Sequence, residues 1–103
     1  MEILDKGGAI ALVYAAVDEV NKQLPRSNRL EKAAATLLYG PGGHLDSLGL
    51  VNLLVNTEEK IAATCGVEVS LVEEVGSDVH NYVGTIESFS EFVRTVIEKK
   101  CNG

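Results

Sequence analysis

The chain has 103 residues, which suits a single domain, residues 1–103, with one small core, and excludes a barrel enzyme or a pair of dinucleotide-binding halves. Apolar residues make up 46% and charged residues 23%, as in folded globular chains, which excludes a disordered protein. Only 5% of the residues are aromatic and none is Trp, so Leu, Val, Ile and Ala must supply most of the core.

The charge is uneven along the chain. The net value is −6, but residues 1–45 and 92–103 carry 0 and +2, whereas residues 46–91 carry −8. This acidic middle repels nucleic-acid phosphates and anionic lipids, so we expect no nucleic-acid or membrane partner and favour protein partners with basic surfaces. An acidic face that only maintains solubility is the alternative interpretation.

The cysteines and the apolar amino-terminal run indicate the cellular compartment. Two cysteines, Cys65 and Cys101, are too few for a disulfide scaffold and lack the spacing of metal ligands. The apolar run at residues 7–17 follows acidic residues and is too short to span a bilayer, so we interpret it as a buried helix and not as a signal peptide. We therefore expect a reduced, cytoplasmic protein without a metal site.

Residues 10–24 carry apolar side chains at steps of three and four, which predicts one buried face of a helix. The apolar positions are Ile10, Val13, Tyr14, Val17, Val20 and Leu24. Pro25 follows the last of them and predicts that the helix ends near Leu24.

Residues 25–45 predict a long loop, because Pro25, Pro41 and the glycines beside Pro41 interrupt any helical period. Leu30 and Leu37 are the side chains expected to pin this loop to the core. A connection of this length is usually either functional or disordered.

A second helix is predicted between Asp46, as its N-cap, and Gly66, as its terminating residue. One apolar stripe of this helix suits the core. It consists of Leu50, Leu54 and Ile61, with Thr57 on the same line. Another stripe is rotated away from the first and consists of Leu48, Val51 and Val55. Because a small chain can bury few helices on every side, we predict that this other stripe is a docking surface.

Two further helices complete the predicted fold. Ser70 and Glu73 form a capping-box pattern that predicts a short helix ended by Gly76. Thr85 is the expected N-cap of a last helix, whose apolar side chains keep a helical period. They are Ile86, Phe89, Val93, Val96 and Ile97. The sequence therefore predicts an all-α small four-helix bundle, with three longer helices, one short helix, and a long loop between the first and second helices.

Ser47 is the strongest candidate for chemistry. It follows Asp46 at the end of a glycine-rich loop, so a phosphate on its hydroxyl would face the unpaired amides and the positive end of the helix dipole. An ordinary first-turn serine is the alternative. A hydrolase is disfavoured, because a neighbour such as His44 cannot approach the hydroxyl from elsewhere in the fold and Leu45 replaces the first glycine of a nucleophile elbow.

The stretch LDSLGLVNLLVNTEEKI at residues 45–61 resembles the second helix of acyl carrier proteins, with the Asp-Ser-Leu signature at its start. VEVSLVEE and GTIESFSEFV resemble the short third-helix region and the final helix of that family. The resemblance implies that Ser47 carries 4′-phosphopantetheine, attached by a phosphopantetheinyl transferase. It also implies that Asp46 and Leu48 flank this attachment site for recognition by the transferase and by partners.

The resemblance further implies a carrier and not an enzyme. Acyl or related intermediates would be held as thioesters and presented to acyl-loading and acyl-using enzymes in fatty-acid, lipid or secondary-metabolite synthesis. Partners would dock on Leu48, Val51, Val55, Glu58 and Glu59. Family members usually place acids two and five residues after the serine, where this chain has Gly49 and Asn52, so docking is expected to depend more on apolar contact. We expect a monomer.

Two alternatives stay open. The sequence GGHLDS at residues 42–47 is also similar to segments of peptidyl and D-alanyl carriers, and this similarity would make the cargo an aminoacyl group. An unmodified helical adaptor that holds a protein partner on the docking stripe is the alternative from another functional class. In a carrier, small side chains near the end of the second helix are expected to leave space for cargo. They are Ala62, Ala63, Val67 and Val69.

Overall fold

The computed structural model describes residues 6–26, 29–40, 42–77 and 79–102. Its helices are α1 (Lys6–Asn21), α2 (Ser47–Cys65), α3 (Leu71–Val75), α4 (Val79–Tyr82) and α5 (Ile86–Asn102). The predicted small all-α bundle is confirmed, with α1, α2 and α5 as its long helices. The sequence does not predict α4, which is a single helical turn.

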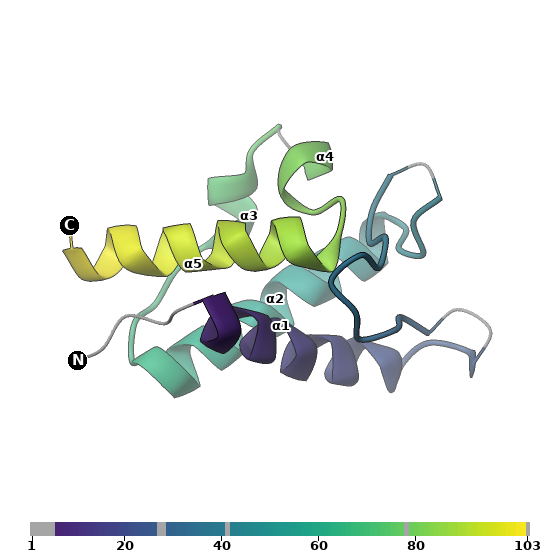
Figure 1. Ribbon diagram of the computed structural model, residues 1–103, viewed down its shortest axis with the longest axis horizontal. Helices are drawn as coiled ribbons and strands as arrows, with labels where there is room; N and C mark the ends of the chain where they lie inside the picture. Colours follow the sequence, from purple (N-terminus) through teal and green to yellow (C-terminus); the bar gives the residue numbers. More distant parts are fainter. Residues whose placement is uncertain (1–5, 27–28, 41, 78, 103) are drawn as a thin grey trace.

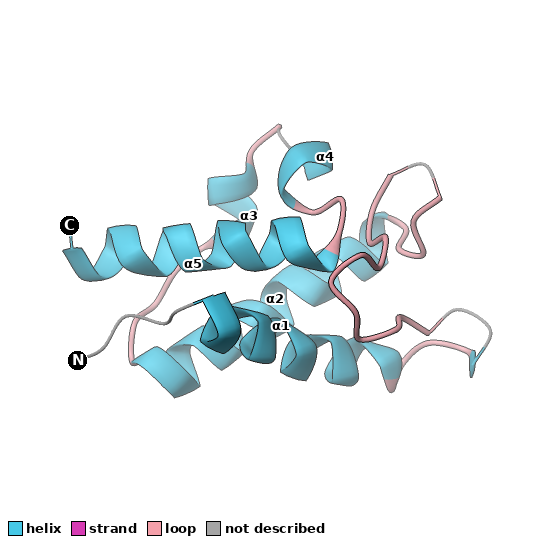
Figure 2. Cartoon of the chain, viewed as in Figure 1, coloured by secondary structure: helices cyan, strands magenta, loops and turns pink. Residues whose placement is uncertain are grey.

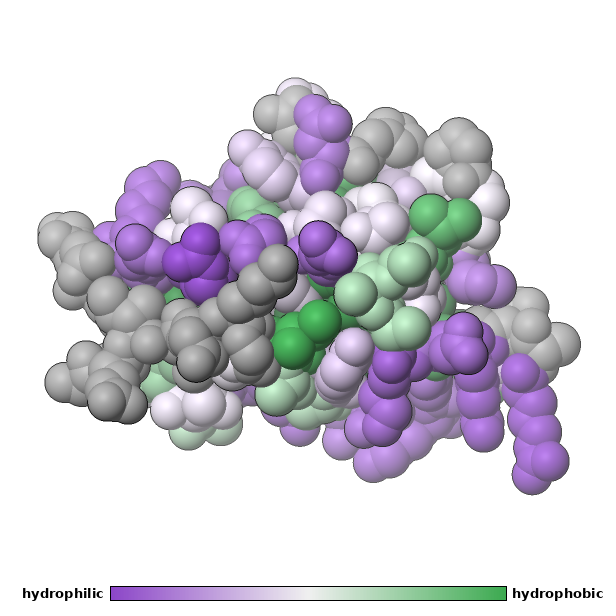
Figure 3. All heavy atoms as spheres, viewed as in Figure 1, coloured by the Kyte–Doolittle hydropathy of each residue, from purple (hydrophilic) through white to green (hydrophobic). Residues whose placement is uncertain are grey.

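Helix α1 is central to the bundle, because it packs against both α2 and α5. In the view of Figure 1, α1 lies below α5, while α3 and α4 lie above α5. The apolar face predicted for the first helix is confirmed at Val13, Val17 and Val20, which are buried. Figure 3 shows hydrophilic side chains gathered over the carboxyl end of α1 and the start of the following loop, where Lys22 and Arg26 are exposed.

Helix α1 ends at Asn21, before the predicted end near Leu24. The ring of Pro25 disfavours helical backbone at the residue before it. In addition, the Asn21 side chain binds the loop: its Nδ2 donates to the Leu30 carbonyl at 2.9 Å, and the Leu30 amide donates to its Oδ1 at 2.7 Å. The helix therefore ends where this side chain ties the next segment to α1.

The loop between α1 and α2, drawn in pink in Figure 2, runs beside the start of α5 and is bonded to it. The amides of Ile86 and Glu87, in the first turn of α5, donate to the carbonyls of Thr36 and Ala34 at 3.0 and 2.9 Å. The first amides of a helix have no partner within the helix. The loop thus supplies acceptors that α5 cannot supply itself.

The prediction that Leu37 pins this loop is wrong. Leu37 is 45% exposed, whereas Leu38 is fully buried. The Leu38 amide donates to the Gly84 carbonyl at 2.7 Å, and Leu37 forms an isolated bridge with Thr85. Side chains alternate along such extended backbone, so Leu37 faces outward when Leu38 faces the core. Leu30, the other predicted anchor, is buried as expected.

Helix α2 begins and ends where the sequence predicts. Gly66 follows its last residue with φ 71°, and the Gly66 amide donates to the Ala62 carbonyl at 3.0 Å. The stripe predicted for the core is buried. It comprises Leu50, Leu54, Thr57 and Ile61. The Thr57 hydroxyl donates to the Leu53 carbonyl at 2.7 Å, so the polar member of this stripe is satisfied within the helix.

Helix α5 begins after Thr85, as predicted. The Ser88 amide donates to Thr85 Oγ1 and the Thr85 amide donates to Ser88 Oγ, both at 3.1 Å. This reciprocal pair satisfies two amides at the helix start. The apolar residues predicted for α5 are buried. No helix in the described part of the chain is long and apolar enough to cross a membrane.

The neighbouring leucines of the loop provide a test of this packing. Leu38→Ala is expected to lower the free energy of unfolding by about 2–5 kcal/mol, because it leaves a cavity in the core. Leu37→Ala, which makes the same chemical change at an exposed position, is expected to cost less than about 1 kcal/mol. Urea denaturation of both variants measures the difference, and equal costs would contradict the packing of the loop.

Candidate functional site

The candidate site is built on the amino-terminal end of α2. Asp46 has extended backbone dihedrals, φ −87° and ψ −174°, and its Oδ1 accepts from the Gly49 amide at 2.8 Å. The predicted N-cap is therefore confirmed. Helix geometry leaves the amides of Ser47 and Leu48 without a carbonyl acceptor inside α2.

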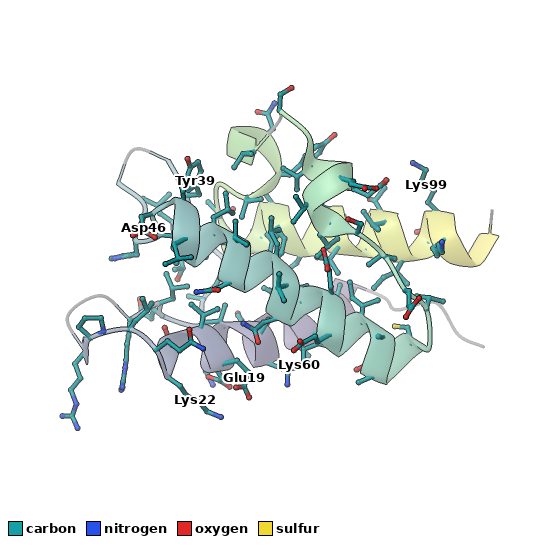
Figure 4. The ribbon with its side chains drawn as sticks, turned by 180° about the vertical axis from the view of Figure 1, so that it is seen from behind. Glu19, Lys22, Tyr39, Asp46, Lys60 and Lys99 are labelled. Carbon is teal, nitrogen blue, oxygen red and sulfur yellow. The ribbon has the colours of Figure 1, made fainter. Side chains whose placement is uncertain are left out.

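Ser47 is the first residue of α2 and is exposed. Leu48 beside it is 70% exposed. Figure 4 shows Asp46 near Tyr39 at one end of the molecule, with Lys99 toward the opposite end. A group attached to the Ser47 oxygen would therefore start at the end of the bundle, on the solvent side of the first turn of α2.

The glycine-rich loop packs tightly where it leads into α2. A Cβ on Gly43 would lie 2.6 Å from the Leu38 carbonyl oxygen, which is too close for any larger residue without movement of the backbone. The same Leu38 carbonyl accepts from the Leu45 amide at 2.9 Å. Buried Leu38 thus holds, through its main chain, the segment that positions Asp46 and Ser47.

The stripe predicted to dock partners is exposed. The exposed fractions are 70% for Leu48, 45% for Val51 and 42% for Val55. No charged residue occurs from Ser47 to Thr57. Gly49, inside this segment, is buried, and a Cβ there would lie 3.1 Å from Leu45 Cδ2. The first three turns of α2 therefore present an uncharged apolar surface, here called the exposed stripe, with Leu48, Val51 and Val55 as its members.

The two acids that follow the exposed stripe have different surroundings. Glu59 is exposed, whereas Glu58 is half-buried and its Oε2 accepts from the Leu71 amide at 2.7 Å. Both were predicted from the sequence to dock partners. Of the two, Glu59 is the more exposed to solvent, because Glu58 connects α2 to the start of α3.

The predicted Ser70–Glu73 capping box does not form. Ser70 occupies the N-cap position of α3, but its side chain makes no capping hydrogen bond. The first amide of α3, that of Leu71, instead donates a hydrogen bond to the Glu58 carboxylate of α2. Sequence reasoning missed this contact, because Glu58 and Leu71 are 13 residues apart and no local pattern connects them.

A surface groove of about 1060 Å³ lies between α2, α3 and α5. Its apolar lining includes Ala62, Val69 and Val96, and its polar lining includes glutamates of α2 and α3 and two lysines of α5. Ala62 and Val69 were among the small residues predicted to leave space near the end of α2. The other two, Ala63 and Val67, are exposed and half-buried and are not part of this groove.

The histidines and cysteines form no metal site in the part of the chain that the structure describes. His44 is exposed in the loop and Cys65 is buried. The side chains of His80 and Cys101 lie outside the described part. Among the described residues, no group of His, Cys, Asp and Glu could hold a metal ion.

In comparisons with known proteins, no family model, curated protein or solved structure matches the chain.

The cap of α2 can be tested by substitution. Asp46→Ala is expected to lower the free energy of unfolding by about 1 kcal/mol, because the Gly49 amide loses its acceptor. Asp46→Asn keeps an oxygen acceptor and should retain most of this stability. Glu59→Ala removes the same charge without removing a cap, and urea denaturation compares the three. A loss in Glu59→Ala equal to that in Asp46→Ala would assign the effect to charge and contradict the capping role.

Proposed function

We propose that this protein is a carrier whose Ser47 bears 4′-phosphopantetheine and whose cargo is a thioester on the thiol of that arm. The observation that supports the proposal most is the exposure of Ser47 at the first residue of a long, capped helix. The hydroxyl is accessible to a modifying enzyme, and the Asp46 cap fixes the backbone beside it. Residues 45–61 resemble the second helix of acyl carrier proteins, and this resemblance favours phosphopantetheine over other groups that can be attached to a serine.

The electrostatics of the site favour a phosphodiester. Its negative charge would lie beside the Ser47 and Leu48 amides and the positive end of the α2 dipole, an arrangement worth about 0.3–1 kcal/mol at an exposed site. In the attachment step, the Ser47 oxygen forms a bond to the phosphorus next to pantetheine in coenzyme A. The pyrophosphate bond breaks, and the hydroxyl proton leaves with the nucleotide phosphate or a base of the transferase.

The exposed stripe is the proposed docking surface for the phosphopantetheinyl transferase and for the enzymes that load and use the cargo. It begins one residue after Ser47, so a partner bound there has its active site near the arm. Because this stretch carries no charge, we propose that partners bind it mainly by apolar contact, with Glu59 at its far end as the exposed acid.

In this proposal the protein itself supplies no catalytic residue, and the partner enzymes form and break the bonds of the cargo. We propose that it works as a monomer in the cytoplasm, where coenzyme A and the partner enzymes are found together. An acyl cargo is preferred. An aminoacyl cargo would use the same serine and the same arm.

Attachment is tested by intact mass after incubation with coenzyme A and a broad-specificity phosphopantetheinyl transferase. The wild type is expected to gain the mass of one phosphopantetheinyl group, and Ser47→Ala is expected to gain none, because it lacks the nucleophilic oxygen. Ser70→Ala is the matched control, since Ser70 is also exposed next to a helix start and its side chain makes no capping bond.

The possible outcomes separate the function classes. A gain in the wild type and in Ser70→Ala, but not in Ser47→Ala, supports the carrier. A wild type that gains no mass, although a known carrier in the same mixture does, overturns the proposal and favours the unmodified adaptor. A gain in Ser47→Ala would place the modification on another residue.

Docking on the exposed stripe is tested by Val51→Ser. We expect the KM of the transferase to rise about three- to tenfold, because the apolar area buried on docking decreases. The increase should persist at about 1 M salt, where charge interactions are screened. Val72→Ser changes a valine of similar exposure on α3 and should leave the KM unchanged. Equal KM values for Val51→Ser and the wild type would contradict docking on this stripe.

A further inference from the structure

Five of the nine basic residues lie together where α1, the following loop and α2 meet. They are Lys22, Arg26, Arg29, Lys32 and Lys60, here called the basic patch. Lys22, Arg29 and Lys60 line a surface hollow of about 590 Å³. Lys32 lies beside this hollow, because its Nζ is 3.2 Å from Oδ1 of Asp18, another lining residue. The Arg29 amide donates to the Arg26 carbonyl at 3.5 Å, which places Arg26 next to the others.

The basic patch is an exception on an acidic protein. The chain carries a net charge of −6, and residues 46–91 carry −8 with Lys60 as their one basic residue. Five glutamates and two lysines line the groove between α2, α3 and α5. Figure 4 shows Lys99 of that groove toward one end of the molecule, and Lys22 in the half that contains Asp46. This separation of charge gives the molecule a field that would orient an approaching charged partner.

The backbone that presents the basic patch is held to the core. Leu30 follows Arg29, is buried, and forms two hydrogen bonds with the Asn21 side chain of α1. Arg29 Nε donates to the Leu24 carbonyl at 3.4 Å, and Leu24 packs against the core. A partner that binds here therefore loses less conformational entropy than one that must order a flexible basic tail.

The lysines and arginines of the basic patch differ in their surroundings. Its three lysines lie 3.2 to 3.9 Å from a carboxylate oxygen of Asp18 or Glu19. Arg26 and Arg29 are exposed, and neither forms an ion pair within the described residues. A guanidinium binds a carboxylate through two parallel N–H···O bonds and is less strongly hydrated than an ammonium. The two arginines are therefore the groups of the patch that suit an incoming carboxylate.

Acidic side chains within the basic patch favour protein carboxylates over a nucleic acid or an anionic bilayer. Asp18 and Glu19 line the hollow, and Glu31 is exposed next to Lys32 in the chain. A phosphate backbone or a lipid surface carries a continuous array of negative charge, which would be repelled by these acids. A protein surface can place single carboxylates at the two arginines and leave the acids with their lysines.

We propose that the basic patch is a docking surface for an acidic protein partner, whose carboxylates bind Arg26 and Arg29. Recognition at this surface is electrostatic, whereas recognition at the exposed stripe of α2 is proposed to be apolar. The proposal does not depend on modification of Ser47.

An NMR titration of the isotope-labelled, unmodified full chain with a synthetic decaglutamate peptide tests this surface. At about 0.1 M salt, where the Debye length is about 10 Å, the amide shifts that change should cluster around Arg26, Arg29 and Lys60. At about 1 M salt, where that length is about 3 Å, binding should be lost. Absence of shift changes at millimolar peptide in the lower salt, or their location on another face, would overturn the proposal.

Substitution of the two arginines tests their role. The double variant Arg26→Ala/Arg29→Ala is expected to raise the Kd of the peptide about tenfold, because each exposed charge pair contributes about threefold. Lys99→Ala/Lys100→Ala removes the same charge from exposed positions of α5 and should change the Kd less than about twofold, because salt screens distant charges. Buried Val17 should keep its amide shift in both free variants, as a check of folding. Equal Kd values for the two double variants would show that net charge alone matters and would refute the proposal.

Two competing probes decide the class of partner. A DNA duplex of mixed sequence and vesicles that contain phosphatidylglycerol are titrated under the same conditions. Both are expected to bind more weakly than the peptide, because their phosphates meet the acids of the patch. Tighter binding of either probe than of the peptide, lost in the arginine double variant, would overturn the assignment to an acidic protein.

Discussion

Burial of one face of α2 is the constraint on which the other features of this molecule depend. Complete burial of a Leu or Ile side chain is worth about 1.5–3 kcal/mol, so Leu50, Leu54 and Ile61 together fix the rotation of α2 about its axis. With that rotation fixed, Leu48, Val51 and Val55 must face solvent. A different rotation would expose the larger apolar set, because the two stripes cannot both be buried against α1 in a bundle of this size.

The two ends of α2 are connected to the rest of the chain in different ways. At its start, main-chain hydrogen bonds from Leu38, close packing at Gly43 and the Asp46 cap hold Ser47 in a well-defined position. Toward its end, Glu58 supports a short helix that has little stability of its own. The start of α2 is thus fixed by several main-chain and packing contacts of the preceding loop, whereas near its end one side-chain hydrogen bond connects α2 to α3.

Several features follow from residues close together in sequence and are predictable from it. Asp46 caps the amide of a residue in the next turn, Gly66 ends α2, and Thr85 and Ser88 cap α5 reciprocally. The period of apolar residues identifies the buried face of each long helix.

The predictions that the structure contradicts also have physical reasons. Leu37 and Leu38 are equally apolar, and only the pairing of the loop with residues 83–85 decides which one enters the core. Likewise, Ser70 and Glu73 have the spacing of a capping box, but α2 supplies the acceptor.

The sequence by itself therefore determined the three long helices, the caps of α2 and α5, the buried faces of the long helices and the serine at the head of α2, because these depend on hydrogen bonds and side-chain spacing within one or two turns. Only the tertiary structure decided the remaining features. The bond from Glu58 to α3, the loop carbonyls at the start of α5 and the burial of Leu38 join residues far apart in the chain. Such contacts depend on how the long helices cross, which no local pattern specifies.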